Sequence, residues 1–579
     1  MRIRDVEILT GLSRKTIRFY EAKGLLSVDR SDNSYREYDE GVVEQLKLIA
    51  LLRRAGISLA DIQLWQDGVI TSGEMLNKRL TELRSEANIA LDQVRLCNQL
   101  LAGELQDLMS DTRTNSEDDP ELDESSDGSG ELCLGLDIGT TTISAVVLSP
   151  TEGRAAGVYT IANASDLPAD HVWEKMQDPE IITGRVEKLL ESLLHRYPGI
   201  KSVGITGQMH GILYINREGN ALSPLYTWQD ERAGMGNPSP CTVLLERTGY
   251  NVSPGYGLAT HFALMQSGEV PDGAVKICTI MDYAVMKLTG NPSPVMHTSN
   301  AASLGFWVTA DSAFDSEAIR RAGMDPDILP PVTASGIQRG TWNGIPVTLA
   351  IGDNQASFLG SVKDPAHAAL ANFGTGSQVS LLCRNPDEIR TDAAMELRPF
   401  LEDTWLASGS ALCGGRAYAL MERFFRQYVT ACGIAPSEQY EIMNKLAEKG
   451  LESGKVLPVR TTFCGTRNDP GLRGSITGIS EDLLTPDAMI AGVLWGMSDE
   501  LHEMFLKMPH SHVDTLILSG NAVRKNPALR KTLKQVFGMD ACLPVHREEA
   551  AFGAAMFSAI ASGYDRDAVR SCIRYSGIE

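Results

Sequence analysis

The sequence lacks the features that mark secreted, membrane-embedded and zinc-binding proteins. Its 579 residues include ten cysteines, and these form no C-x-x-C pair and have no histidines beside them at metal-ligand spacing. No zinc site is therefore predicted, and scattered single cysteines favour a reducing compartment. No apolar run reaches membrane-spanning length, residues 550–561 being the nearest. The N-terminus lacks the apolar core of a signal peptide, so a cytoplasmic location is expected.

Positive charge is also scarce over the chain as a whole. The sequence has 53 Lys and Arg against 74 Asp and Glu, a formal net charge of −21, which argues against non-specific binding of nucleic acid by the whole molecule. The first 64 residues differ, because their eleven Lys and Arg nearly balance their ten Asp and Glu. A specialised DNA-binding segment is compatible with that region. The length and the hydrophobic content of 43% indicate a globular protein of several domains.

The N-terminal region has the pattern of a helix-turn-helix. Residues 6–13 predict a short helix, a glycine turn and an N-cap serine, and residues 14–21 predict a second helix with a basic start. A β-wing is predicted at residues 35–38, followed by amphipathic helices. The stretches TIRFYE, GLL and YREY resemble the MerR family of transcription regulators over residues 1–70, which implies an all-α winged helix-turn-helix domain. The expected DNA contacts are Arg14, Lys15, Thr16, Arg18, Tyr20, Tyr35 and Arg36. The alternative is a small helical domain that touches no DNA.

A long helix and an acidic tether are predicted after this head. Apolar residues recur at spacings of four and three from Leu76 to Leu101, a heptad seam within a helix over residues 71–110. MerR-like proteins pair through such a helix, so the resemblance implies a homodimer, whereas a helix packed on its own chain is the alternative. Residues 111–131 hold nine Asp and Glu and one Arg, with Ser, Gly and Pro, and predict a flexible linker.

Two similar loops indicate a phosphate-binding unit that occurs twice. Residues 134–142 read as an apolar strand that ends on Asp137, followed by Gly139, Thr140, Thr141 and Thr142. A hairpin loop of this kind can bind phosphate with N–H groups and hydroxyls, and Asp137 can hold Mg²⁺ directly or through water. Alone, the stretch also fits an ordinary hairpin. Residues 369–377 repeat the plan with Gly374, Thr375, Gly376 and Ser377. Phosphates clamped between the copies are therefore expected.

A strand ending in a carboxylate lies between the loops, at residues 349–355. The set resembles the FGGY carbohydrate kinases, of the actin/Hsp70/sugar-kinase fold group, over residues 132–575. The resemblance implies an α/β fold of two ribonuclease H-like lobes, 132–375 and 376–579, closing over ATP and Mg²⁺. Asp353 is then the candidate general base, because a sugar hydroxyl must lose its proton as it attacks the γ-phosphoryl group. Asp353 could equally be a helix N-cap, and both roles could hold.

The sugar site is expected at the loops after two further strands. Residues 205–211 offer polar groups for hydroxyls and a methionine for the carbon chain, and residues 225–232 add an aromatic ring beside a carboxylate. The expected sugar contacts, in part carried over from the family's Met-His and Trp-x-Asp motifs, are Gln208, Met209, His210, Trp228, Asp230, Asn300 and Asn354. Without the family, His210 and Trp228 would be interpreted as core residues. Gly520 and Asn521 resemble the family's adenosine-binding turn.

The predicted function is ATP-dependent phosphorylation of a ketose on a chain with a DNA-binding head. The stretch GTRNDP at residues 465–470 favours sedoheptulose, with xylulose or a related ketose next. Three residues depart from the family pattern: Ser144 stands where Lys or Arg is usual, Ser519 replaces a glycine and Gln229 replaces a commoner Asn. The alternative is a transcription regulator whose kinase-like half binds its ligand only as a signal.

Overall fold

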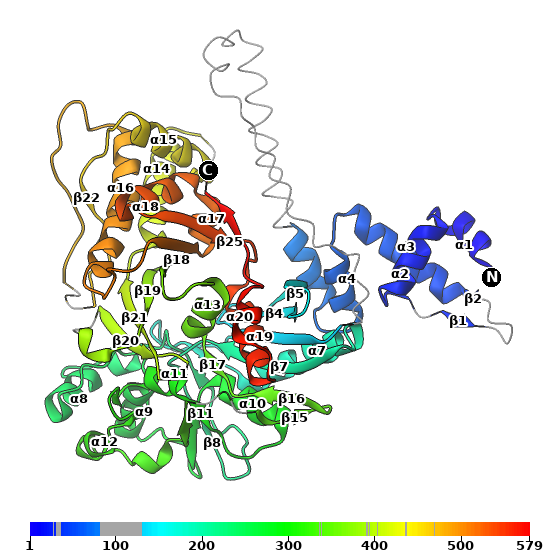
Figure 1. Ribbon diagram of the computed structural model, residues 1–579, viewed down its shortest axis with the longest axis horizontal. Coiled ribbons are helices and arrows are strands. Elements are labelled where there is room, and N and C mark those ends of the chain that lie inside the picture. The colour runs from blue at the N-terminus through cyan, green and yellow to red at the C-terminus, as the bar shows by residue number, and fades with distance from the viewer. Residues whose placement is uncertain are drawn as a thin grey trace, which may run out of the picture. The chain divides into compact units, whose positions relative to one another are not determined.

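The computed structural model describes residues 1–26, 28–30, 36–80, 130–334, 336, 338–389, 392, 394–401, 403–434, 437–467, 469 and 471–578. Within these ranges the chain forms two compact units (Figure 1). The first contains the described part of residues 1–129 together with Ile182–Gly199, and the second contains Gly130–Ile181 and the described part of Ile200–Glu579. The predicted coiled coil beyond residue 80 and the acidic linker up to residue 129 lie outside the described residues.

The first unit confirms the predicted winged helix-turn-helix fold. Its elements are α1 (Ile3–Thr10), α2 (Arg14–Ala22), β1 (Asp29–Arg30), β2 (Arg36–Glu37), α3 (Glu40–Arg54) and α4 (Leu59–Gln66). Gly11 ends α1 with a φ of 71°, in the left-handed region that glycine tolerates, and the hydroxyl of Ser13 caps α2 by accepting from the Thr16 N–H at 3.1 Å. Val6, Ile17 and Leu46 form a fully buried core.

A helix from later in the sequence also belongs to this first unit. Residues 72–80 are helical, and α7 (Pro179–Arg196) contributes its residues from Ile182 onward. Within the unit, the Arg185 guanidinium pairs with Glu74 at 3.1 Å, and the Ser192 hydroxyl donates to Asp67. Because residue 185 lies more than a hundred positions from residue 74, local sequence patterns do not predict this grouping.

The second unit begins with a mixed sheet that we call the sheet of lobe I. Its strand order is β15-β16-β7-β3-β4-β5, with β17 also paired to β7. The strands are β3 (Leu132–Ile138), β4 (Thr142–Ser149), β5 (Arg154–Ala162), β7 (Ile200–Gly207), β15 (Gln338–Trp342), β16 (Ile345–Thr348) and β17 (Ile351–Gly352). β3 pairs antiparallel with β4 and parallel with β7, so that Asp137 lies opposite Ser144 on one side and Thr206 on the other.

Lobe II is built on a second sheet that repeats this arrangement. Its order is β20-β21-β19-β18-β24-β25-β26. The strands are β18 (Ala368–Phe373), β19 (Ser377–Cys383), β20 (Met395–Pro399), β21 (Trp405–Ala411), β24 (Thr515–Ser519), β25 (Asp540–Pro544) and β26 (Tyr575–Gly577). β18 pairs antiparallel with β19 and parallel with β24, which places Asn372 between Gln378 and Ser519. Asn372 therefore occupies in lobe II the position that Asp137 has in lobe I, and the predicted two-lobed α/β fold is confirmed.

The expected boundary between the lobes needs a correction. A division between residues 375 and 376 would cut the β18–β19 hairpin, whose strands pair from Ala369↔Leu381 to Phe373↔Ser377. β18 belongs to the lobe II sheet because both of its neighbours, β19 and β24, lie there. The second phosphate loop is therefore inside lobe II and does not mark its start.

Two helices pack between the sheets (Figure 1). α13 (Asp353–Ser361) follows β17 directly, and α19 (Glu549–Ala561) comes from the C-terminal part of the chain. Small residues allow close packing: a Cβ on Gly135 of β3 would lie 2.0 Å from the Ala551 carbonyl oxygen, and one on Gly204 of β7 would lie 2.1 Å from that of Ala554. Helix α19 thus covers the lobe I sheet and joins the cores of the two lobes.

The remaining elements of the second unit surround these layers. Lobe I has a further apolar core, formed by buried residues between Ile212 and Leu329. The remaining elements of lobe I lie around it. They are β6 (Met176–Gln177), β8 (Leu213–Ile215), β9 (Leu225–Tyr226), η1 (Arg232–Gly234), α8 (Pro240–Thr248), α9 (Gly257–Ser267), β10 (Lys276–Cys278), α10 (Ile280–Thr289), β11 (Met296–His297), α11 (Thr298–Ala301), η2 (Ala302–Leu304), β12 (Trp307–Val308), β13 (Ala313–Phe314), α12 (Ser316–Ala322), η3 (Pro326–Ile328) and β14 (Val332–Thr333). Lobe II adds η4 (Pro386–Glu388), α14 (Gly415–Ala431), α15 (Tyr440–Glu452), β22 (Val459–Arg460), β23 (Ser475–Ile476), α16 (Pro486–Phe505), α17 (Asn521–Lys525), α18 (Pro527–Phe537) and α20 (Arg566–Arg570). Among the described residues, no helix is both long and apolar enough to cross a membrane.

Candidate functional site

A small cavity lies where the two repeated hairpins face α13. Its volume is about 230 Å³, and its lining comes from the end of β3, the start of α13 and the strands β18 and β19. The lining residues are Asp137, Asp353, Asn354, Ser357, Leu370, Asn372, Gln378, Ser380 and Ala550. The cavity thus brings together the two carboxylates that the sequence analysis singled out, although they are far apart in the chain.

Burial makes both carboxylates in this small cavity harder to ionise. Burial raises the pKa of Asp137 to about 8, and the negative charges of Asp353 and Glu548 act in the same direction. Burial also raises the pKa of Asp353 to about 6, against the lowering effect of the Arg398 charge. A cation between such groups would relieve their repulsion. Among the described residues no group of three or more His, Cys, Asp or Glu side chains is placed to hold a metal.

Asp353 is the first residue of α13, and Gly352 occupies the N-cap position. The alternative that Asp353 itself is the N-cap therefore does not describe this helix. A hydrogen bond from the backbone N–H of Asn354, the next residue of the helix, acts on the Asp353 carboxylate and lowers its pKa. This carboxylate lies in the first helical turn, where the partial positive charge of the helix N-terminus favours a negative side chain.

Both hairpin loops are held through their carbonyl oxygens. In the first loop, Asn163 donates to the Gly139 oxygen at 2.7 Å and Gln177 to the Thr140 oxygen at 2.8 Å. In the second loop, the N–H groups of Gly415 and Arg416 donate to the Gly374 and Thr375 oxygens, both at 3.0 Å. These bonds fix the loop backbones without using their N–H groups. The exposed turns can therefore present N–H donors to an anion.

The predicted adenosine turn depends on a glycine. Gly520 has a φ of 93°, and a Cβ there would lie 2.5 Å from the Phe373 carbonyl oxygen. Asn521 follows as the first residue of α17. Ser519, which departs from the family pattern, is buried and accepts a hydrogen bond from the Asn372 side chain at 2.8 Å. The hydroxyl therefore ties β24 to β18 at the edge of the small cavity.

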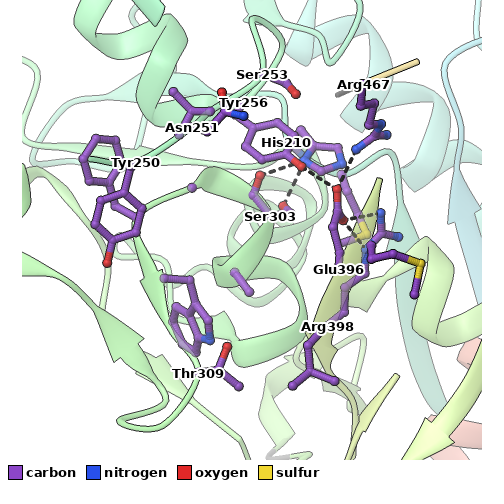
Figure 2. Close-up of a pocket in the computed structure, with 18 of the residues that line it drawn as sticks. His210, Tyr250, Asn251, Ser253, Tyr256, Ser303, Thr309, Glu396, Arg398 and Arg467 are labelled. Carbon is purple, nitrogen blue, oxygen red and sulfur yellow. Dashed lines mark hydrogen bonds and ion pairs between the residues drawn. The ribbon is translucent and has the colours of Figure 1, made fainter. Parts of the chain in front are cut away.

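A larger cavity of about 450 Å³ lies between the lobes (Figure 2). Lobe I lines it with Met209, His210 and the segments 250–256 and 299–309, and lobe II with Asp392, Arg467 and part of β20. Its volume falls in the range of small-molecule sites, roughly 300–1,000 Å³. The lining combines aromatic and aliphatic surfaces with hydroxyl and charged groups, which suits a polyhydroxylated ligand with a carbon backbone.

His210 is fixed as a neutral hydrogen-bond acceptor in this cavity. Its Nδ1 lies 2.7 Å from the Ser303 carbonyl oxygen, and because a carbonyl can only accept, Nδ1 carries the proton and Nε2 is left as an acceptor. Burial lowers the pKa of His210 to about 4, and the Arg398 charge adds to this. The ring stacks on Tyr256 with centroids 4.6 Å apart, so its orientation is constrained.

The lobe II wall of the cavity carries an ionic cluster centred on Glu396 (Figure 2). One carboxylate oxygen accepts from Arg467 at 2.6 Å and from the Tyr256 hydroxyl at 2.9 Å, and the other accepts from Arg398 at 2.7 and 2.8 Å. Burial alone would raise the pKa of Glu396, but Arg398 and Arg467 lower it to about 2. The cluster therefore stays ionised at neutral pH.

The two cavities meet at the turn between β17 and α13. The Gly352 N–H donates to the Ser299 hydroxyl at 3.1 Å, and a Cβ on Gly352 would lie 2.7 Å from the Met209 sulfur. Ser299 and Met209 line the large cavity, while the next residue, Asp353, lines the small one. The residue predicted to be the base thus lines the small cavity and is bonded in the chain to Gly352, which contacts the lining of the large one.

Three other residues predicted to bind the sugar, Gln208, Trp228 and Asp230, lie outside the large cavity. Gln208 and Trp228 form a network with the first loop: the Trp228 Nε1 donates to the Thr140 hydroxyl at 3.0 Å, and that hydroxyl donates to Gln208 at 3.3 Å. Asp230 is fully buried and pairs with Arg232 at 2.7 Å. Neither Trp228 nor Asp230 lines either cavity.

Two predicted asparagines are engaged by protein groups. Asn300 is buried on α11 and donates to Thr279 and Asp282, at 2.8 and 2.9 Å, and it lines neither cavity. Asn354 lines the small cavity and exchanges hydrogen bonds of 2.9 and 2.6 Å with Gln378 across the lobes.

The sequence analysis missed the cluster residues Tyr256, Glu396 and Arg398, and the cavity residues Asn372 and Gln378. Glu396 and Arg398 alternate with apolar residues along β20, so both point to one face of the sheet. Two opposite charges two residues apart in a strand were the sequence signal from which this ionic cluster could have been predicted. Nothing local indicated that Tyr256 would meet them.

The predicted DNA-contacting residues mostly lie on the surface of the first unit. Arg14, Lys15 and Arg18 are exposed on α2, and Arg14 pairs with Glu7 at 2.6 Å. Thr16 is half-buried and bonded to the Ser13 cap. Tyr20 differs from the expectation, because its side chain is only 7% exposed and packs into the core. Arg36 lies on β2, and Tyr35 is outside the described residues.

Comparison with known proteins matches both parts of the chain. Residues 132–360 and 369–562 match the N-terminal and C-terminal domains of the FGGY family of carbohydrate kinases, and residues 1–68 match the MerR HTH family regulatory protein. Sedoheptulokinase from Mus musculus is 27% identical over 470 residues, covering 73% of this chain and 96% of that protein. Sedoheptulokinase from Homo sapiens is 25% identical over 453 residues, covering 70% and 93%. The crystal structure of xylulose kinase from Rhodospirillum rubrum has a TM-score of 0.66 at 19% identity, covering 77% of this chain and 93% of that one, and thus shares the fold.

Proposed function

The chain belongs to the FGGY family of carbohydrate kinases and is an ATP-dependent sugar kinase with a MerR-like N-terminal domain, and we propose that its acceptor is a ketose, with sedoheptulose as the first candidate and xylulose next. The observation that carries this proposal is the position of Asp353: it lines the small cavity and directly follows Gly352, which bonds to Ser299 of the large cavity. A carboxylate there can reach an acceptor in the large cavity while the phosphates of ATP lie between the hairpin loops. The neutral, polar lining around His210 suits a sugar hydroxyl.

In the proposed reaction, Asp353 accepts the proton of the attacking hydroxyl as the γ-phosphoryl group is transferred. His210 Nε2 accepts a hydrogen bond from the sugar, and Met209 packs against its carbon chain. The loop N–H groups and the hydroxyls of Thr140, Thr141, Thr142 and Thr375 bind the phosphate oxygens, and Gly520 and Asn521 contact the adenosine. Mg²⁺ held by Asp137 and the phosphates would supply charge neutralisation during transfer.

The test of the base is Asp353→Asn, which keeps the shape of the side chain. Turnover should fall by about 10²–10⁴, the usual contribution of a general base, while sugar binding measured by calorimetry stays within a few fold. Asp282→Asn is the matched control, because burial raises the pKa of that carboxyl as well, to about 7, but it lines neither cavity. Full turnover in Asp353→Asn would rule out the assignment.

The test of the acceptor is a coupled assay of ADP formation over sedoheptulose, xylulose, ribulose, gluconate and glycerol. We expect the highest kcat/KM for a ketose. Preference for glycerol or gluconate would contradict the proposal. Sugar binding without turnover of any acceptor would favour the alternative that the kinase half acts only as a ligand sensor; the presence of both Asp137 and Asp353 supports catalysis over that alternative.

We also propose that the first unit binds promoter DNA as a homodimer in the cytoplasm. The exposed basic start of α2 supports DNA contact. Leu76 and Leu80 are 46% and 48% exposed, as expected for the beginning of a seam that a second copy covers. In titrations of the full chain with a palindromic promoter fragment, Lys15→Ala with Arg18→Ala should weaken binding and lower its salt dependence. Lys47→Ala, an exposed charge on α3, is the control; sedimentation of a monomer would contradict the dimer.

A further inference from the structure

Counting bonds among the described residues, the arginines of the Glu396 cluster have more hydrogen-bond donors than they use. A guanidinium group has five N–H donors in a rigid fork. The bonds to Glu396 use two donors of Arg398 and one donor of Arg467. Arg398, Glu396 and Arg467 all line the large cavity. The carboxylate thus acts as a fixed anchor that orients two guanidinium groups toward the space where the acceptor would lie (Figure 2).

The charges of the cavity wall indicate the class of ligand. Arg398 and Arg467 contribute two positive charges, and Glu396 and Asp392 two negative ones. Asp392 is itself held by the N–H groups of Ala394 and Met395, both at 2.8 Å. The lining therefore has no net charge, and a sugar acid or a sugar phosphate would bring an unbalanced negative charge into it. Hydroxyl oxygens of a neutral sugar can accept from the spare guanidinium N–H groups without leaving a charge unpaired.

The cluster also joins the lobes. Tyr256 stands at the N-cap of α9 in lobe I, whereas Glu396 and Arg398 lie on β20 and Arg467 follows β22 in lobe II. The Tyr256–Glu396 hydrogen bond of 2.9 Å therefore links the two lobes at the wall of the cavity. Because the same Tyr256 stacks on His210, the lobe II wall is positioned relative to the acceptor-binding imidazole.

We propose that the Glu396–Arg398–Arg467 cluster, bridged to lobe I by Tyr256, is a subsite of lobe II that binds the chain hydroxyls of a neutral polyhydroxy ketose and selects long acceptors over short ones. The inference rests on the proposed function, since it places the acceptor in the large cavity. A three-carbon acceptor held near Asp353 by His210 and Met209 presents few hydroxyls to this wall. Each added carbon of a ketose presents another, so the binding contribution of the subsite grows with chain length.

Arg467→Met is the variant that tests the subsite, because Arg467 lies on a loop, is a quarter exposed and makes one bond to the anchor. For sedoheptulose, kcat/KM and the association constant should fall about 10- to 100-fold, the range for one charge-assisted hydrogen bond. For glycerol or another short acceptor the loss should stay below about threefold, because that contact is not made.

Arg460→Met is the matched control: it removes the same group from neighbouring β22, where Arg460 is exposed and lines a different cavity. Tyr256→Phe is the second variant, because it deletes the bridging hydroxyl and leaves the ring that stacks on His210. It should lower kcat/KM for long ketoses more than for short acceptors, with unchanged thermal stability.

The outcomes separate this inference from the proposed function. Equal losses for all acceptors in Arg467→Met and Tyr256→Phe would mean that the cluster is structural and would overturn the inference, with the kinase assignment intact. Tighter binding of gluconate than of any neutral ketose would also overturn it. If the wild-type protein binds sedoheptulose without phosphorylating any sugar, the proposed function fails, but a length-dependent loss of binding in the variants would still support the subsite. Absence of sugar binding altogether would overturn both.

Discussion

Alanine in place of Gly553 should destabilise the kinase half and reduce its turnover. Gly553 lies where α19 crosses α13, and a Cβ added there would lie 1.8 Å from the Ala356 carbonyl oxygen and 3.0 Å from the Gly360 nitrogen. Ordinary contact begins at 3.4 Å, so the helices must separate by about 1.6 Å along this line, the difference between the two distances. The obstructing atoms are backbone atoms, and no rotamer change can relieve the contact.

The magnitude follows from two opposing effects. Overpacking of a core typically costs about 1–3 kcal/mol, and a backbone clash belongs at the upper end of that range. Alanine recovers up to about 1 kcal/mol of helix propensity relative to glycine. The free energy of unfolding should therefore fall by about 2 kcal/mol, which lowers Tm by roughly 4–8 °C if one lobe of about 200–250 residues unfolds as a unit.

The functional effect should be larger than the loss of stability implies. Asp353 is the first residue of α13, so a shift of that helix moves the carboxylate relative to both cavities. Misplacement of a catalytic group by about 1 Å can cost on the order of 10² in rate, and we expect kcat to fall by that order at a temperature where the variant is folded. Urea denaturation and ADP formation measure the two effects on the same preparation.

Gly184→Ala on α7 provides the control, because a Cβ there would meet no atom within 4 Å. That variant should be as stable as the wild type or slightly more so, with unchanged turnover. A Gly553→Ala protein with wild-type stability and turnover would refute the argument that the close approach of α13 and α19 sets the position of Asp353.

Three further predictions concern the base, the first phosphate loop and the head. Since Asp353 acts only when ionised and its pKa is raised to about 6, kcat/KM should fall as pH drops through about 6; Arg398→Gln removes a charge that lowers this pKa and should move the acid limb of the pH–rate profile to higher pH. Trp228→Phe deletes the 3.0 Å bond to Thr140 and should raise the KM for ATP about three- to tenfold, and an unchanged KM would contradict a role in ordering that loop. Ser58→Ala removes the N-cap of α4 and should lower the stability of the first unit by about 1 kcal/mol without affecting turnover, as thermal unfolding and the kinase assay can check.

Local signals made much of this fold predictable. The turn glycines Gly11 and Gly139 and the N-cap Ser13 determine the structure of only a few neighbouring residues. The ends of the hairpin strands are also recognisable, because the sequence changes there from apolar to small or polar residues. The hairpin repeat was visible because both copies keep the same short order of residue types. Asp137 and Asp353 could be singled out for the same reason, since Asp137 is the last residue but one of β3 and Asp353 directly follows β17.

The arrangement of distant elements depends on long-range packing, which local sequence signals do not predict. The sequence by itself determined the helix-turn-helix, the two phosphate loops and the carboxylates at strand ends, because those depend on backbone preferences and on patterns a few residues long. Only the tertiary structure placed α7 in the first unit, laid α19 against the lobe I sheet, buried Tyr20 and Asp230, and brought Tyr256 onto Glu396, 140 positions away. Such contacts depend on which surfaces of distant elements fit together, and that complementarity is a property of the folded chain as a whole.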